Sequence, residues 1–240
     1  MKKILLLLAV SLFILPATAQ RKVNAHWCAL GTSITWYNEN VEASLGGFTR
    51  GYQSRVMDKI SFSRYSNQAV NGGAIKTALN KVIKADYYTI EHGINDWGQS
   101  IPVGTFDDYL NNTNNGSFAA EYRKLIDAIY RANPAAKIVI CTPRRGYGFN
   151  GYLPDKSTDP KNGIYLKEYA DMARRIAEFE SIPVADFYEE CGGDRTLIKE
   201  SLDGARASQG ITNDAVHPND LGYQRMANVL IDALERVLVD

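Results

Sequence analysis

Short apolar runs alternate with amphipathic stretches along most of this sequence. Strands are predicted where β-branched and aromatic residues cluster, at 23–30, within 62–70, and at 87–91, 136–142 and 182–187. Helices are predicted where apolar residues recur every three to four positions, at 49–60, 74–83, 118–129, 165–179 and 226–237. Alternation of strands with helices predicts a parallel sheet that helices cover on both faces, which is an α/β fold.

Composition fits one ordinary globular domain. The chain has 240 residues, of which 45% are hydrophobic and 22% charged, so a disordered chain, a collagen and a disulfide scaffold are all excluded. Lysine plus arginine and aspartate plus glutamate number 27 each, which gives a formal net charge of zero. This balance gives no indication of nucleic-acid binding, which would need a clustered basic surface.

The N-terminus has the pattern of a signal peptide. Lys2 and Lys3 precede an apolar run from Ile4 to Leu15, which is shorter than the roughly 20 residues of a membrane-spanning helix. The small residues of 17–19 then form a cleavage motif, so residues 1–19 are predicted to be removed and 20–240 to be the mature domain. The alternative is an anchor that is never cleaved. Cleavage would make the protein secreted or periplasmic, with no later segment apolar enough to span a membrane.

The three cysteines do not indicate a disulfide framework. Cys28, Cys141 and Cys191 are an odd number, so at least one thiol stays free. Cys28 and Cys141 lie within predicted core strands, where a free thiol behaves as a small hydrophobic side chain. We therefore expect buried, unreactive thiols.

Turns rich in glycine and polar residues follow the first three predicted strands. They are Gly31-Thr32-Ser33, Asn71-Gly72-Gly73 and residues 93–96 (Gly-Ile-Asn-Asp). Parallel sheets bind ligands beyond the carboxyl ends of their strands, so all three turns are expected to open onto one crevice. Two long loops, 100–116 and 143–163, are also predicted, and the sequence does not decide whether they act as lids.

A nucleophile and a base can be assigned from residue types. The Ser33 hydroxyl follows a strand directly, but it needs a nearby base to react. Asp214 stands three residues before His217, so on one helical turn its carboxylate could accept from Nδ1–H and leave Nε2 free as that base. Each part also has a structural explanation: a serine turn for Ser33, and a capping aspartate with a surface histidine for the pair.

Two further residues could stabilise an oxyanion. Gly72 has no Cβ, so its backbone N–H can approach a ligand closely, and Asn95 offers a side-chain amide. A tetrahedral oxyanion needs two or three such fixed donors. Ordinary turn formation is the alternative explanation for both residues.

Taken together, these motifs resemble the SGNH hydrolases, also called the GDSL esterase and lipase family. The order is Gly-x-Ser, then Asn67 to Gly72, then Gly-x-Asn-Asp, then Asp-x-x-His-Pro, and the matches run from Cys28 to Pro218. The resemblance implies a three-layer α/β/α sandwich with a flavodoxin-like, five-stranded parallel sheet.

The resemblance also implies the roles of the site residues. Ser33 would be the nucleophile, His217 the base and Asp214 its orienting carboxylate, with the Ser33 and Gly72 N–H groups and the Asn95 amide as the oxyanion hole. No metal or organic cofactor is implied. Thr32 stands where the family usually has aspartate, and Ala69 where it often has glycine. These departures affect the expected hydrogen bonding around Ser33 and the subfamily.

Aromatic residues and arginine near the expected site favour a carbohydrate substrate. Sugar rings stack on aromatic faces, and we predict that Trp36, Tyr37, Trp97 and Arg145 bind substrate. These aromatic rings could equally cover the sheet edge. The remaining histidines, His26 and His92, are interpreted as structural, because no cluster has metal-ligand spacing.

The predicted function is that of a secreted serine esterase, a carbohydrate O-deacetylase whose partner is a small-molecule or glycan ester. Two alternatives stay open from the sequence. One is a lysophospholipase or thioesterase, and the other is a non-catalytic glycan-binding protein on the same fold. The acyl group, the natural substrate and the oligomeric state are not determined by the sequence.

Overall fold

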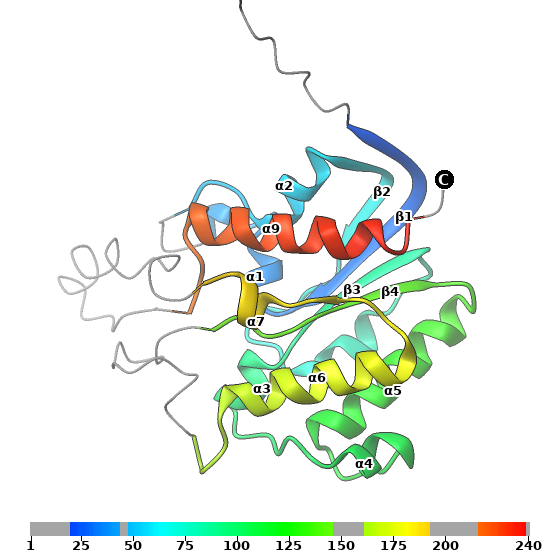
Figure 1. Cartoon of the computed structure of the whole chain (residues 1–240), viewed down its shortest axis with the longest axis vertical. Helices are drawn as coiled ribbons and strands as arrows, with labels where there is room; N and C mark the ends of the chain where they lie inside the picture. The colour runs from blue at the N-terminus through cyan, green and yellow to red at the C-terminus, as the bar shows by residue number, and fades with distance from the viewer. Residues whose placement is uncertain (1–19, 44–47, 146–160, 193–215, 239–240) are drawn as a thin grey trace, which may run out of the picture.

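The fold is built on one parallel sheet. The computed structural model describes residues 20–43, 48–145, 161–192 and 216–238 (Figure 1). Five strands lie in the order β2-β1-β3-β4-β5, and every neighbouring pair is parallel. Their bounds are β1 Arg21–Gly31, β2 Ile60–Asn67, β3 Tyr87–Glu91, β4 Lys137–Cys141 and β5 Val184–Ala185. The predicted α/β fold with five parallel strands is confirmed.

Helices cover both faces of the sheet. On one side lie α1 Ser33–Trp36, α2 Tyr52–Met57, α7 Phe187–Glu190 and α9 Asp220–Glu235 (Figure 1). On the other lie the 3₁₀ helix η2 Ile75–Lys81, α3 Ile94–Gly98, α4 Phe106–Leu110, α5 Phe118–Ala132 and α6 Leu166–Glu180. A short 3₁₀ helix, η1 Val41–Ala43, follows α1. The molecule is therefore a three-layer α/β/α sandwich.

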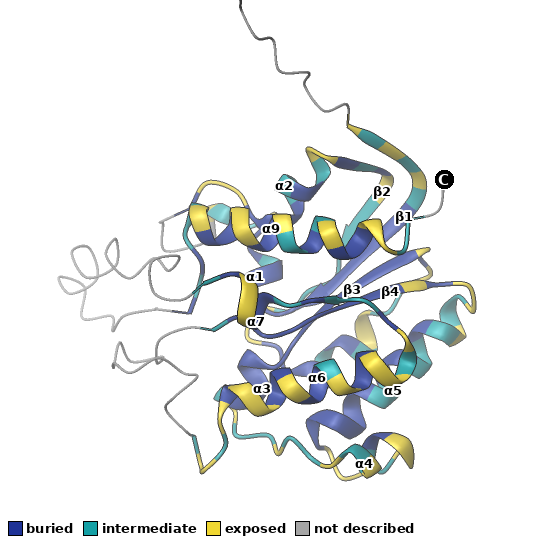
Figure 2. Cartoon of the chain, in the orientation of Figure 1, coloured by how far each residue is buried: buried dark blue, intermediate teal, exposed yellow. Residues whose placement is uncertain are grey.

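Alternation along the strands produces two hydrophobic cores. In β3, Tyr88 and Ile90 face the α5 and α6 layer, whereas Tyr87 faces the α2 and α9 layer. All five residues of β3 are buried, as expected for a central parallel strand that is covered on both faces (Figure 2). Figure 2 also shows that α5, α6 and α9 bury one side and expose the other.

Side-chain caps fix where the long helices begin. The Ser117 side chain accepts a hydrogen bond from the Ala120 N–H at the start of α5, and the Asn219 side chain accepts one from the Gly222 N–H at the start of α9. α6 ends at Glu180, and the next residue, Ser181, is its C-cap with a left-handed φ of 57°. The α9 cap lies two residues after His217, so it holds the chain close to that histidine.

Several element bounds differ from the sequence prediction. The helix predicted over 49–60 is only α2, Tyr52–Met57, and the one predicted over 74–83 is the 3₁₀ helix η2. The last helix begins at Asp220 because Asn219 caps it, six residues before the predicted start. The predicted loop 100–116 contains α4, and a capping box formed by Thr105 and Asp108 stabilises the start of this helix. Most of loop 143–163 lies outside the described residues.

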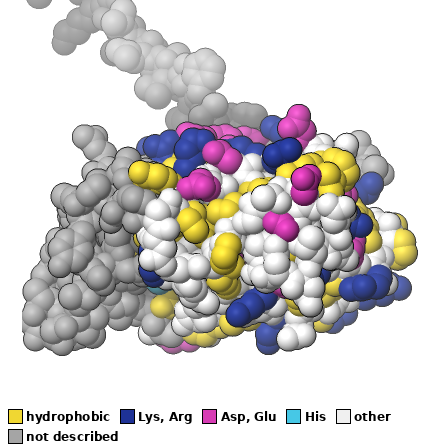
Figure 3. All heavy atoms as spheres, turned by 90° about the horizontal axis from the view of Figure 1, so that it is seen from below, with side chains coloured by type: hydrophobic (Ala, Val, Ile, Leu, Met, Phe, Trp, Pro, Cys, Tyr) yellow, Lys and Arg dark blue, Asp and Glu magenta, His cyan; other side chains and the backbone are white. Residues whose placement is uncertain are grey.

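Three further properties follow from the described part of the chain. No helix in it is long and apolar enough to cross a membrane. All three cysteines are buried and free, as predicted. On the face that Figure 3 shows, basic and acidic side chains lie close together with hydrophobic ones between them. Charge of one sign therefore does not dominate that face. The predicted signal peptide, residues 1–19, lies outside the described residues.

Candidate active site

Ser33 is the first residue of α1, directly beyond the carboxyl end of β1. Thr32 caps this short helix, because its hydroxyl oxygen accepts from the Ile34 N–H at 3.3 Å. Ser33 is 5% exposed. As the first amide of a helix, the Ser33 N–H has no acceptor within the helix, so it can donate to a bound group.

His217 lies within hydrogen-bond distance of Ser33. Its Nε2 is 2.8 Å from Ser33 Oγ, although the two residues are 184 positions apart in the chain. The Tyr37 ring meets the imidazole edge-on, with 4.8 Å between ring centroids. A serine hydroxyl that can pass its proton to an imidazole is an activated nucleophile. Asp214, the predicted orienting carboxylate, lies outside the described residues.

The two predicted oxyanion-hole turns lie against each other. Asn95 Nδ2 donates to the Gly73 carbonyl at 3.1 Å, which leaves its second hydrogen available. Gln99 Nε2 donates to the Gly72 carbonyl at 2.9 Å. Gly72 has a φ of +71°, a backbone conformation that residues other than glycine rarely adopt. The Val70 N–H donates to the Gly31 carbonyl, which ties this turn to the end of β1.

The Asp96 side chain connects the same two turns, those that carry Gly72 and Asn95. Its carboxylate accepts from the Ile75 N–H at 3.1 Å and from the Gly93 N–H at 3.2 Å, and the residue is fully buried. Burial raises the pKa of Asp96 to about 7. The aspartate of the Gly-x-Asn-Asp motif therefore holds together the two turns that carry Gly72 and Asn95.

A second buried carboxylate, Glu91, holds the turn that carries Ser33. Glu91 is the last residue of β3, and its Oε2 accepts from both the N–H and the hydroxyl of Thr32, at 3.1 and 2.7 Å. The same oxygen accepts from the Thr35 hydroxyl at 3.1 Å. Burial raises the pKa of Glu91 to about 7. Sequence reasoning missed this residue, although an acid at the end of an otherwise uncharged buried strand is a signal.

The predicted substrate-binding residues are largely engaged with the protein. Trp97 is 5% exposed, and its indole N–H donates to the Ile164 carbonyl at 2.9 Å. Tyr37 is also buried, against His217 and Phe48. Arg145 donates from Nε to the Tyr188 carbonyl at 3.0 Å and pairs with Glu189 at 2.6 Å. Of the three aromatic residues in this predicted set, Trp36 is the one that is partly exposed, and its ring meets that of Tyr37 edge-on.

The other two histidines are both buried. His26 Nε2 lies 2.9 Å from Ser66 Oγ, and burial lowers its pKa. Neither ring nitrogen of His92 has a hydrogen-bond partner among the described residues, and burial lowers its pKa to about 3, so its imidazole is neutral. Within the same residues, no group of three or more His, Cys, Asp or Glu side chains could hold a metal ion.

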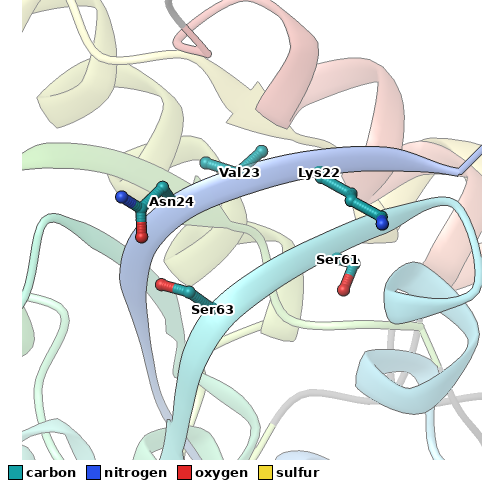
Figure 4. A pocket seen from close by; sticks show the side chains of 5 residues that line it. All are labelled: Lys22, Val23, Asn24, Ser61 and Ser63. Atoms are coloured by element: carbon teal, nitrogen blue, oxygen red, sulfur yellow. The ribbon is translucent and has the colours of Figure 1, made fainter.

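A shallow pocket lies at the opposite ends of the strands. Lys22, Val23 and Asn24 of β1 and Ser61 and Ser63 of β2 line it (Figure 4). The strands are parallel and these residues lie in their first halves, whereas Ser33 follows the end of β1. The pocket is therefore remote from the serine and the histidine.

The family follows from comparison with known proteins. Residues 29–225 match the model of the GDSL-like Lipase/Acylhydrolase family. The chain belongs to this family. The match includes Ser33, Gly72, Asn95 and His217, so the geometry described above lies within the GDSL-like domain. No curated protein matches the chain in sequence.

Solved structures agree with this GDSL-like assignment. A possible lipase from Chitinophaga pinensis DSM 2588 is 27% identical, with a TM-score of 0.73 over 89% of this chain and 99% of that one. A GDSL-like lipase from Bacteroides thetaiotaomicron VPI-5482 is 16% identical, with a TM-score of 0.56 over 89% of each chain. The second likeness shows the fold alone. Membership implies that the protein is an ester hydrolase of the lipase/acylhydrolase type.

Proposed function

We propose that this protein is a secreted serine esterase that removes O-acetyl groups from carbohydrate through an acyl-enzyme on Ser33. The observation that carries the catalytic part is the 2.8 Å separation of Ser33 Oγ and His217 Nε2. The hydroxyl proton then has an acceptor at the moment the oxygen attacks an ester carbonyl.

The proposed reaction has two halves. In the first, the Oγ–carbon bond forms as His217 Nε2 takes the Ser33 proton, and the carbonyl oxygen becomes an oxyanion that faces the Ser33 and Gly72 N–H groups and the Asn95 amide. Collapse breaks the bond to the alkoxy oxygen, which leaves as an alcohol with the proton from His217. In the second half, His217 deprotonates a water, which attacks the acyl group and releases the acid and the free Ser33 hydroxyl.

Asp214 is proposed to orient His217 by accepting from Nδ1–H. This role rests on the Asp-x-x-His-Pro spacing in the sequence. Asp214→Asn is expected to lower kcat because the amide can favour the wrong imidazole tautomer.

Site-directed variants test the nucleophile and base. We expect the purified protein to hydrolyse p-nitrophenyl acetate, and Ser33→Ala and His217→Ala each to lower kcat by about a thousandfold or more. Ser63→Ala is the matched control, because this serine is exposed on β2 in the remote pocket of Figure 4. Full activity of Ser33→Ala would remove Ser33 from the mechanism.

The choice of acetylated carbohydrate rests on the loops. Loops 100–116 and 143–163 contain few leucines or isoleucines, and Trp36 is the last residue of the helix that Ser33 begins. An aliphatic groove would suit a long acyl chain better. Acetate release from a panel of acetylated oligosaccharides, measured beside release of long-chain fatty acids from their esters, tests this choice. Preference for long chains would favour a lysophospholipase or thioesterase instead.

Labelling with a fluorophosphonate probe separates an enzyme from a non-catalytic glycan-binding protein. An activated Ser33 oxygen displaces fluoride and becomes covalently modified. We expect labelling of the wild-type chain and of Ser63→Ala, but none of Ser33→Ala. Measurable glycan affinity without labelling would support the binding protein.

A further inference from the structure

Glu91 differs from the other buried acids in what it binds. The Oε2 atom alone takes three hydrogen bonds, two from Thr32 and one from Thr35. Thr32 directly precedes Ser33 in the sequence, and Thr35 follows it by two positions. The Glu91 Oε1 atom has no partner among the described residues, so every hydrogen bond of this carboxylate is directed at the nucleophile turn.

The hydrogen bonds run in one direction, from the Tyr52 hydroxyl to the Thr35 hydroxyl and from there to Glu91. Thr35 Oγ1 has one proton, and if it is given to Glu91, the 2.8 Å contact with Tyr52 must be a bond that the Tyr52 hydroxyl donates. Thr32 and Thr35 are fully buried, as is Tyr52. Water does not reach these groups, so Glu91 is the acceptor on which their hydrogen bonding depends.

Packing leaves the nucleophile turn little room to adjust. A Cβ on Gly31 would lie 2.3 Å from Thr35 Oγ1 and 3.2 Å from the Glu91 carbonyl oxygen. The Gln53 and Asn67 side-chain amides also donate to the Thr35 carbonyl, at 2.8 and 2.9 Å. The end of β1, the start of α1 and the end of β3 are therefore fixed together around one carboxylate oxygen.

We infer that Glu91 is a positioning residue for the reaction, because its Oε2 holds the Thr32 and Thr35 donors and thereby sets the direction of the Ser33 hydroxyl and N–H toward His217 and the substrate. Glu91 does not itself touch substrate. The inference rests on the proposed function, and it gives Thr32, the departure from the usual Gly-Asp-Ser motif, a defined partner.

Paired substitutions at Glu91 test this role. Glu91→Met has a similar length but no acceptor oxygen, whereas Glu91→Gln keeps one. For p-nitrophenyl acetate we expect Glu91→Met to lower kcat by about a hundredfold with KM nearly unchanged, since small misplacements of reacting groups cost this much. Glu91→Gln should recover about tenfold of that loss because its amide oxygen still accepts from Thr32. Thr32→Val removes the hydroxyl that donates to Glu91 and also accepts from the Ile34 N–H, so it should lose at least as much kcat as Glu91→Gln, and it serves where Glu91→Met does not fold.

The matched control is Glu121→Gln. Glu121 is also a largely buried acid, but it lies on α5 and pairs with Lys124 at 2.7 Å. We expect its kcat to equal that of the wild type. All rates are taken per folded molecule, with folding checked by circular dichroism, and amide hydrogen exchange of residues 32–36 is measured in parallel. Exchange in this segment should become faster in the Glu91 variants and stay unchanged in Glu121→Gln.

The outcomes separate the inference from the proposed function. An active wild type with folded Glu91 and Thr32 variants of unchanged kcat overturns the inference and leaves the proposed function intact. Equal losses in Glu91→Met and Glu91→Gln, with no faster exchange at 32–36, also overturn it. A wild-type chain that neither hydrolyses esters nor reacts with the fluorophosphonate probe overturns the proposed function, and the inference with it.

Discussion

Glu91 is a costly residue to bury, and its cost depends on pH. Because burial raises its pKa from an ordinary 4.5 to about 7, the folded protein holds this proton at a pH where the unfolded chain has lost it. The native state therefore gains stability from this residue as pH falls from about 7 to 4.5, and loses it as pH rises through 7.

We predict that Glu91→Gln removes this pH dependence. Relative to the variant, the wild type should gain up to about 3 kcal/mol in free energy of unfolding between about pH 8 and pH 5. Urea titrations of both proteins across this range provide the measurement. The Asp96 charge contributes to the raised pKa of Glu91, so the difference between the two proteins includes this coupling. A difference that does not change with pH would contradict the prediction.

Two glycines near the site should respond differently to alanine. At Gly31 the new Cβ would meet Thr35 Oγ1 at 2.3 Å, so we expect a loss of about 1–3 kcal/mol in stability and a lower kcat as α1 shifts. At Gly72 the Cβ would meet nothing within 4 Å, so only the strain of its +71° φ remains, about 1–2 kcal/mol. The backbone N–H survives in Gly72→Ala. Thermal denaturation and p-nitrophenyl acetate kinetics on both variants distinguish the two cases.

At the scale of elements, Asp96 connects η2 to α3. The two begin beside each other because the Ile75 and Gly93 N–H groups share this carboxylate. Asp96→Asn replaces one acceptor oxygen by an NH₂ group that faces a buried N–H, so we expect a loss of about 1–3 kcal/mol in stability. Chemical denaturation measures it. Asp107→Asn, an exposed substitution on α4, is the control and should change stability by less than about 0.5 kcal/mol.

Trp97 and Trp36 separate packing from substrate binding. Trp97→Phe keeps a ring in the core but loses the donor to Ile164, so stability should fall by about 1 kcal/mol with KM unchanged. Trp36→Ala should raise KM for an acetylated oligosaccharide by about fivefold and leave KM for p-nitrophenyl acetate nearly constant. A raised KM in Trp97→Phe would show that the buried indole reaches the sugar after all.

For the whole molecule, patterns of single segments predicted the sheet and its layers well. The runs of Ile138 to Ile140 and of Tyr87 to Ile90 were predicted as strands and are buried in β4 and β3, and the apolar faces of α5 and α6 were clear from their spacing. Short elements such as α1, α3 and α7 were missed because tertiary contacts and caps define them, and a few residues carry no periodicity.

The candidate site was predictable where motifs lie at strand ends. Ser33, Asn95 and His217 each belong to a short sequence motif, and the order of those motifs along the chain indicated the family. Glu91 accepts from Thr32 and Asp96 accepts from Ile75, and these partners lie 59 and 21 positions away in the chain, so local patterns do not identify them. The burial of Trp97 could not be predicted either, because the sequence around a single aromatic residue does not show whether its side chain faces solvent or the core.

The buried thiols offer a test of how cooperatively the two layers unfold. Cys28 belongs to the core beneath α5 and α6, whereas Cys141 belongs to the core beneath α2 and α9. Burial raises the pKa of Cys28 to about 12 and that of Cys141 well above its usual value, so neither reacts without an opening of the structure. Both cores share one sheet, whose strands contribute residues to each.

We predict that both thiols react with a thiol reagent through the same global opening. In increasing urea below the unfolding transition, the modification rates of Cys28 and Cys141 should rise with one slope, equal to that of global unfolding. Mass spectrometry of peptides after timed labelling measures each site, and the urea-unfolded protein gives the intrinsic rates. A shallower slope for one cysteine would show that its layer opens alone. If Cys141 had the shallower slope, the layer that carries α1 and Ser33 would be able to move while the α5 and α6 layer stays folded.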